Sequence, residues 1–220
     1  MERRLLFFKK FLGKSLFVTM IFLLAVVVNA QGAAINAGFE TGELTGWTAN
    51  GSATVVTSHY NEYGGAVTYL PPEGSYFLAI SSGSANVWQT VSQSLTFLAG
   101  ETIGGMAAFN WGDYSGYPDG AMVQILDYTG AQIALPFYAD GSNHTDGYNG
   151  PWTPWSWTAL SGGTYVLQYA ARNTGDSGGP EQTFGYFDAA QIKGVPEPTT
   201  MVLLAFGLLG LAGVRRKLQK

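Results

Sequence analysis

The chain has 220 residues, no cysteine, 30 glycines, 14% aromatic residues and a formal net charge of −4. Without cysteine, the protein has neither a disulfide framework nor thiol chemistry. Between the two termini, residues 31–195 hold thirteen acidic and only two basic residues, a net charge of −11 that disfavours binding to nucleic acid or to anionic membranes.

Residues 1–30 have the organisation of a secretory signal peptide. An apolar run from Leu16 to Val28 follows a basic region, and Val28-Asn29-Ala30 places small or medium residues at a cleavage site before Gln31. A first transmembrane helix is the alternative, but the run is short and polar residues follow it at once. We therefore predict export. The basic residues before the run are Arg3, Arg4, Lys9, Lys10 and Lys14.

Residues 31–194 form one predicted domain, an antiparallel β-sandwich. Glycine and aromatic residues are abundant there, and short alternating segments recur between turn residues. In the clearest segment, Tyr165, Leu167, Tyr169 and Ala171 share one face, and the residues between them share the other. The predicted strands are Ala53–Thr57, Tyr76–Ser81, Val87–Ser92, Thr102–Phe109, Ala121–Asp127, Gln132–Phe137, Trp155–Ala159, Thr164–Arg172 and Phe184–Ile192.

Residues 195–220 have three parts in a fixed order. A Pro196-Glu197-Pro198 motif precedes an apolar helix predicted at about 201–214, and a basic tail follows at 215–220. As a helix, the apolar run would span roughly 21 Å, which is short against about 30 Å of hydrocarbon. Arg215 and Arg216 are expected to stay cytoplasmic. An ordinary C-terminal membrane anchor is the alternative.

This tail resembles the PEP-CTERM sorting signal of exported Gram-negative bacterial proteins. The resemblance implies recognition by an exosortase, a membrane protease-transpeptidase, and a genome that also encodes exopolysaccharide machinery. It also implies that the C-terminal helix holds the protein in the inner membrane only until the protein is sorted to the cell surface or extracellular matrix. The residues implied in sorting are Pro196, Glu197, Pro198, Arg215 and Arg216.

The start of the mature chain, from Asn36 to Trp47, resembles the first strand of galactose-binding-like and carbohydrate-binding jelly-roll modules. Phe187-Asp188-Ala189 resembles their last strand. The resemblance implies a structural calcium ion held by Glu40 and Asp188, and carbonyl groups around Gly38 and Gly42 could complete its shell. This chain has alanine after Asp188, where such modules often have a second Asp or Asn, so one possible ligand is missing.

Other loops resemble passengers found with the same sorting tail, whose function is mostly unassigned. The matching blocks lie at 112–121, 150–157 and 173–176. Asp113, Asp119 and Asp176 in these loops could bind calcium through hard oxygen ligands. Because Asp and Gly are also the usual turn residues, a purely structural role is the favoured interpretation.

The aromatic residues fall into two groups. Trp47, Trp88 and Trp111 lie in or beside apolar strands and are predicted to be core residues. Exposed aromatic rings stack on sugars. The aromatic run from Tyr148 to Trp157 therefore suggests carbohydrate binding by Trp152, Tyr148 and Trp155, with core packing as the alternative, favoured for Trp155 and for Trp157.

Catalysis has little support in the sequence. The two histidines, His59 and His144, belong to no recognisable catalytic motif, and no pair among the acidic residues is distinguished for glycoside hydrolysis. We therefore predict a non-catalytic protein of the envelope or matrix that binds exopolysaccharide. A secreted polysaccharide hydrolase and a purely structural coat protein are the alternatives.

Overall fold

The computed structural model describes residues 34–175, 183–193 and 206–207. The chain divides into two units, Met1–Gln31 and Gly32–Lys220, and the first of these lies wholly outside the described residues. The predicted signal peptide therefore lies outside them as well. Phe206 and Gly207 are helical. Within the described part of the chain, no helix is long and apolar enough to cross a membrane.

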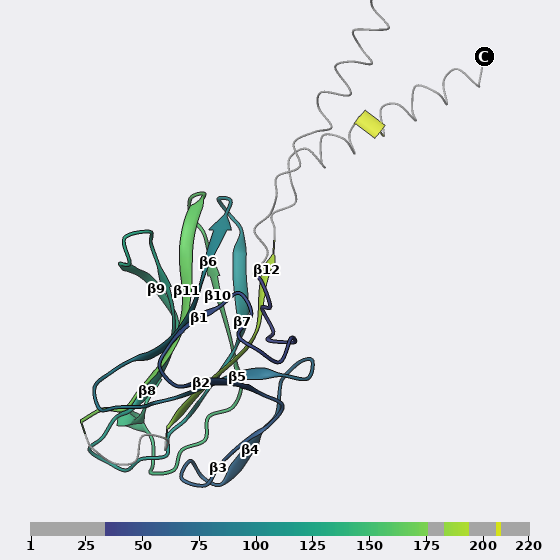
Figure 1. Ribbon diagram of the computed structural model, residues 1–220. Coiled ribbons are helices and arrows are strands. Elements are labelled where there is room, and N and C mark those ends of the chain that lie inside the picture. The colour runs from purple at the N-terminus through teal and green to yellow at the C-terminus, as the bar shows by residue number, and fades with distance from the viewer. Residues whose placement is uncertain (1–33, 176–182, 194–205, 208–220) are drawn as a thin grey trace, which may run out of the picture. The chain divides into compact units, whose positions relative to one another are not determined.

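The second unit is an all-β sandwich, which confirms the predicted fold class (Figure 1). Its strands are β1 Thr48–Asn50, β2 Ala53–Val56, β3 His59–Asn61, β4 Val67–Tyr69, β5 Phe77–Ser81, β6 Gln89–Phe97, β7 Thr102–Asn110, β8 Gly120–Leu126, β9 Gln132–Asp140, β10 Thr153–Thr158, β11 Gly163–Arg172 and β12 Phe184–Lys193, with a 3-10 turn at Gly141–Asn143.

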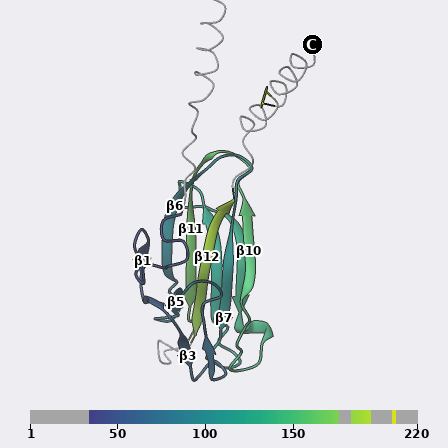
Figure 2. The same ribbon diagram turned by 90° about the vertical axis from the view of Figure 1, so that its right-hand side faces the viewer.

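Two five-stranded antiparallel sheets form the sandwich. Sheet A has the order β1-β6-β11-β8-β9, and sheet B has the order β10-β7-β12-β5-β2. From β5 to β8, and again from β9 to β12, consecutive strands alternate between the two sheets, and among these eight strands only the β8–β9 hairpin stays within one sheet. This connectivity is that of a jelly roll. The view turned by 90° shows β12 between β5 and β7 in sheet B (Figure 2).

The alternation of side chains along the strands places the core between the sheets. Along β6, Val91, Leu95 and Phe97 are buried, whereas the serine and threonine residues between them are more exposed. Tyr169 of sheet A stacks on Phe187 of sheet B with ring centroids 4.6 Å apart. The two predicted faces of β11 are confirmed, because Leu167 and Tyr169 pack in this core. All nine predicted strands are present.

A second hydrophobic cluster lies on sheet B and includes the small third sheet, β3–β4. Tyr69 of β4 packs at 4.3 Å from Tyr186, and His59 of β3 shares a 2.8 Å hydrogen bond with the Tyr186 hydroxyl. The two strands of this hairpin are three residues each, too short for the alternation of side chains to predict them.

The segment before β1 is the main departure from the predicted strands. Residues 35–46 contain turns where the resemblance predicted a first strand, because Asn36, Phe39, Gly42 and Gly46 all have positive φ angles. Such residues cannot continue an extended strand. The segment is nevertheless attached to the sandwich: Phe39 is fully buried, and the Ala190 N–H donates to the Ala37 carbonyl at 3.2 Å.

Candidate functional site

Three carboxylates surround Gly38 at the end of the sandwich where the first segment meets β12. A Cβ atom built on Gly38 would lie 3.5 Å from Asp188 Oδ1, 3.7 Å from Glu73 Oε1 and 3.8 Å from Glu40 Cγ. The structure therefore brings Glu40, Asp188 and Gly38 together, as expected, and adds Glu73, which sequence reasoning missed. Glu73 stands in an exposed Pro-Pro-Glu-Gly loop, and no sequence pattern relates it to Asp188.

Asp188 is fully buried and only half satisfied. Its Oδ1 accepts a 2.6 Å hydrogen bond from the Ala189 N–H, whereas its Oδ2 has no hydrogen-bond partner. Burial raises the pKa of the Asp188 carboxyl to about 7, and the negative charges of Glu73 and Glu40 act in the same direction. A buried, ionised carboxylate with an unpartnered oxygen costs folding free energy. Binding of a proton or a cation to this carboxylate would therefore stabilise the folded protein.

A β-bulge in β12 gives Asp188 its position. The register with β7 shifts between Asp188 and Gln191, and Ala189 has a φ angle of 60°. A bulge of this kind redirects the side chains beside it. The alanine after Asp188 thus contributes its N–H to the carboxylate, although it offers no side-chain ligand.

Glu40 holds the loop that precedes β5 in place. Its carboxylate accepts hydrogen bonds from the Ser75 N–H at 3.0 and 3.1 Å and from the Tyr76 N–H at 3.2 Å. Gly42 lies elsewhere: a Cβ at this position would meet the Tyr76 ring at 3.3 Å. Among the described residues, no three His, Cys, Asp or Glu side chains converge closely enough to hold a metal ion by themselves. A cation here would need main-chain carbonyls as additional ligands.

The aromatic residues predicted to bind carbohydrate do not form one surface. Trp155 is only 4% exposed and packs in the core edge-on to Tyr169, as the alternative interpretation expected. Tyr148 is half-buried and stacks on His144, with ring centroids 3.5 Å apart. Trp152 belongs instead to the second cluster, and its indole N–H donates to the Leu70 carbonyl at 3.0 Å.

Trp88 corrects the core prediction, whereas Trp47 and Trp111 are buried as predicted. Trp88 is only partly buried and immediately precedes β6. The inward residues of β6 are Gln89, Val91 and the alternate residues after them, so Trp88 lies on the opposite, outer face of sheet A. The sequence contained an indication of this outer position. Alternate residues of a strand lie on the same face, so Trp88 shares its face with Thr90 and Ser92, which are polar.

The outer face of sheet A carries a regular grid of side chains, which we define by its strand register. One row contains Arg172, Gly120 and Asp140, with Trp88 beside them at the start of β6. The next row contains Thr90, Ala170, Met122 and Tyr138, and a third contains Thr48, Ser92, Gln168 and Gln124. Across these rows, neighbouring strands lie about 4.8 Å apart.

Aromatic and hydrogen-bonding groups alternate on this outer face. The Arg172 guanidinium lies 4.8 Å from the centre of the Trp88 ring, and a Cβ on Gly120 would lie 3.5 Å from the same ring. Tyr138 is 48% exposed and its hydroxyl donates to Asp140 at 2.8 Å. The Gln124 side chain donates to that of Gln168 at 2.5 Å. The face thus offers apolar rings beside polar groups, the combination that suits a sugar ring and its hydroxyl rim.

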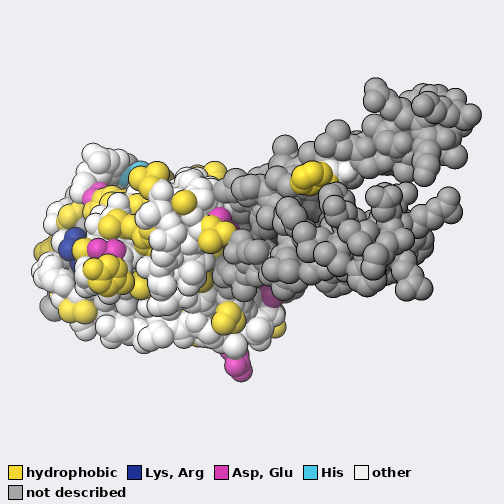
Figure 3. All heavy atoms as spheres, turned by 90° about the horizontal axis from the view of Figure 1, so that it is seen from above, with side chains coloured by type: hydrophobic (Ala, Val, Ile, Leu, Met, Phe, Trp, Pro, Cys, Tyr) yellow, Lys and Arg dark blue, Asp and Glu magenta, His cyan; other side chains and the backbone are white. Residues whose placement is uncertain are grey.

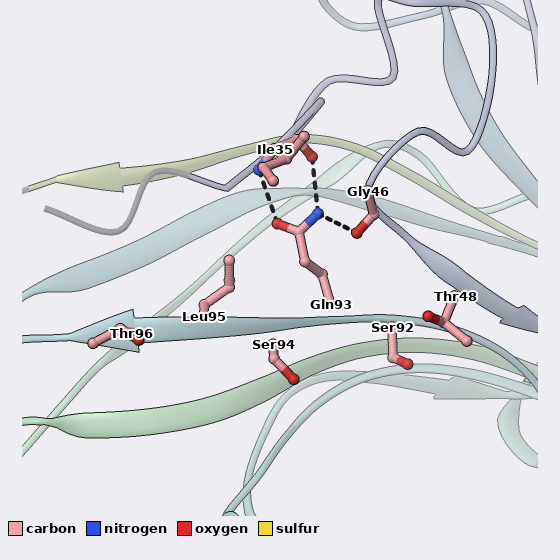
Figure 4. A pocket seen from close by; sticks show the side chains of 8 residues that line it. All are labelled: Ile35, Gly46, Thr48, Ser92, Gln93, Ser94, Leu95 and Thr96. Atoms are coloured by element: carbon pink, nitrogen blue, oxygen red, sulfur yellow. Dashed lines mark hydrogen bonds between the residues drawn. The ribbon is translucent and has the colours of Figure 1, made fainter.

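A hollow of about 460 Å³ lies at the β6 edge of the same face (Figure 4). Its wall includes four hydroxyl residues, and the Gln93 amide binds both the N–H and the C=O of Ile35 as well as the Gly46 carbonyl. The first segment is therefore held against β6 by a side chain that replaces a strand partner. The hydroxyl residues are Thr48, Ser92, Ser94 and Thr96.

The loop aspartates and the histidines have local structural contacts. Asp113 Oδ1 accepts from the Tyr114 N–H at 2.8 Å, and Asp119 Oδ1 accepts from the Thr174 N–H at 2.6 Å. Asp176 lies outside the described residues. Burial of the His59 ring against Phe184 and Tyr186 of β12 lowers the pKa of His59. These contacts tie loops to strands, in agreement with the structural interpretation of the aspartates.

Residues 194–217 match the family model of the PEP-CTERM protein-sorting motif, which confirms the sorting signal predicted at the C-terminus. Most of the matched residues, including the Pro-Glu-Pro motif and the two arginines, lie outside the described part of the structure. No curated protein sequence matches the chain.

Several solved structures are similar to the described domain. TmCBM61 in complex with β-1,4-galactotriose has 16% identity and a TM-score of 0.45, with 73% of this chain and 97% of that chain covered. The CBM22-1 xylan-binding domain of Paenibacillus barcinonensis Xyn10C has 18% identity and a TM-score of 0.41, covering 74% and 95%. The enzymatically active domain of bacteriophage CBA120 tailspike protein 4 has 11% identity and a TM-score of 0.41, covering 73% and 21%. This chain therefore spans about a fifth of the tailspike chain.

Proposed function

We propose that this protein is an exported, surface-sorted and non-catalytic glycan-binding protein of the cell envelope or extracellular matrix. The observation that carries the proposal is the outer face of sheet A, where the partly buried Trp88 lies beside Arg172 and the 48% exposed Tyr138 stands next to Met122 in the adjoining row. The C-terminal sorting motif supports a surface location. Exopolysaccharide is the ligand class proposed for this face, since it is the polymer that such a sorted protein would meet.

Trp88→Ala tests the glycan site. We expect the full-length variant to lose at least about tenfold in affinity for the glycans that the wild-type protein binds on an array. Tryptophan residues are enriched among the few residues that carry most of the binding energy of an interface. Tyr128→Ala is the matched control: this tyrosine is 88% exposed in the β8–β9 turn, away from the face. Release of reducing ends from a bound glycan would support a hydrolase instead, and wild-type protein without glycan binding or turnover would favour a coat protein.

The sorting step has its own test. We expect an exosortase-type protease to process the chain near Pro196-Glu197-Pro198 after export, so that the inner membrane holds the helix only transiently. Mass spectrometry of protein from the native envelope should then find a C-terminus upstream of Met201. Intact Lys220 on all mature molecules would leave the ordinary-anchor interpretation in place.

We further propose that calcium stabilises the domain near Gly38. Asp188 and Glu40 would be its carboxylate ligands, with Glu73 close by, and the unpartnered Oδ2 of Asp188 is the feature that favours a cation there. A bound Ca²⁺ would supply positive charge between three carboxylates that otherwise repel one another, with carbonyl groups filling the rest of its six to eight positions.

A further inference from the structure

Arg172 is unusual for its surroundings. It is one of only two basic residues in a stretch of net charge −11, yet across residues 34–175 and 183–193 no carboxylate forms an ion pair with it. In the space-filling view, acidic side chains are dispersed and basic ones occupy a very small part of the face shown (Figure 3). An arginine that serves only to neutralise the domain would be expected to pair with one of the many carboxylates.

Within residues 34–175 and 183–193, the Arg172 guanidinium donates no side-chain hydrogen bond. A guanidinium has five N–H donors in a planar fork that matches a carboxylate. The contact with Trp88 is one of stacking and occupies none of these donors. The buried Nε has no acceptor, and Arg172 as a whole is partly exposed, so the Nη groups are the donors that a ligand can reach.

Asp140, the acid in the same row of the grid as Arg172, is already engaged. It lies two strands away from Arg172, about 10 Å at the usual strand spacing. Its Oδ2 accepts from the Tyr138 hydroxyl and its Oδ1 from the Ser142 N–H. Among the described residues of this face, the guanidinium is thus the one positive group, and the polar groups around it are amides, hydroxyls and the Asp140 carboxylate.

We infer that the ligand of this face is a largely neutral glycan that carries a carboxylate, and that Arg172 binds this carboxylate while the adjoining sugar packs against Trp88. The inference rests on the proposed glycan-binding function. A densely charged polyanion does not fit, because the remaining acidic surface repels it. A single carboxylate fits, because charges farther away than about 8 Å are screened at physiological ionic strength.

The test compares matched ligands. Oligosaccharides from uronate-containing bacterial exopolysaccharides are arrayed beside the same oligosaccharides with the carboxyl group reduced to an alcohol. We expect full-length wild-type protein to bind the acidic members roughly 10- to 100-fold more tightly, the range for hydrogen bonds to charged groups. Arg172→Gln should remove this preference, lowering the affinity for the acidic members far more than that for the reduced members, whereas Arg172→Lys should retain part of it.

Lys193→Gln is the control for charge. It removes the same positive charge from an exposed position at the end of β12, and should leave the preference intact. Equal binding of acidic and reduced oligosaccharides would overturn the inference and leave the glycan function standing. An equal loss for both ligands in Arg172→Gln would also overturn it, because Arg172 would then only support Trp88. No binding by any member would overturn the glycan function itself.

Discussion

In metal-free buffer at pH 8, the Asp188→Asn variant should melt above the wild-type protein. Asp188 has a pKa raised to about 7 in the folded state by burial, against 3.8 as its ordinary value. The folded state therefore holds this proton more tightly than the unfolded state, and the wild-type protein loses stability as the pH rises from about 4 through about 7. The loss is about 2–4 kcal/mol, or roughly 5–15 °C in melting temperature for a domain of this size.

The same variant tests calcium. Millimolar Ca²⁺ should stabilise the wild-type protein at pH 8 by roughly 0.4–1.4 kcal/mol for a site of extracellular affinity, and should not affect Asp188→Asn. Differential scanning calorimetry with calcium or EDTA at pH 5 and pH 8 measures both effects. Glu43→Gln is the control, since Glu43 is an exposed acid of the same segment. A wild-type melting curve that EDTA leaves unmoved at pH 8 would contradict the calcium site.

Phe187→Ala should destabilise the whole sandwich by about 3–5 kcal/mol, the usual cost of removing a buried phenylalanine ring. Phe187 is fully buried on β12 and stacks on Tyr169 of sheet A, so it joins the two sheets. The midpoint of urea unfolding should fall accordingly, with the slope of the transition unchanged.

Two other variants calibrate this result. Phe187→Leu retains most of the apolar volume and should lose much less stability. Tyr128→Ala removes a ring that is 88% exposed and should stay within about 0.5 kcal/mol of the wild-type value. If Phe187→Ala were as stable as Tyr128→Ala, the two sheets would not be joined by this stack.

Sequence-based prediction was most accurate for strands in which apolar and polar side chains alternate with a period of two residues. Alternation along 164–172 correctly separated the two faces of β11, because the period of a strand is set by its backbone alone. Trp88 was predicted to be a core residue, although the same period groups it with Thr90 and Ser92 on the outer face. Alternation shows which residues share a face, and only the second sheet decides which face is covered.

The candidate sites divide in the same way. The amino-acid sequence by itself determined the sandwich class, nine of the twelve strands, the acidic surplus and the C-terminal sorting motif, since all of these depend on composition, period or contiguous residues. Only the tertiary structure decided that Glu73 joins Glu40 and Asp188, that Asp188 keeps an unpartnered oxygen, and that Arg172 stands beside Trp88. These features arise from the approach of segments that are distant along the chain, and their burial and hydrogen bonding do not exist until the two sheets have packed.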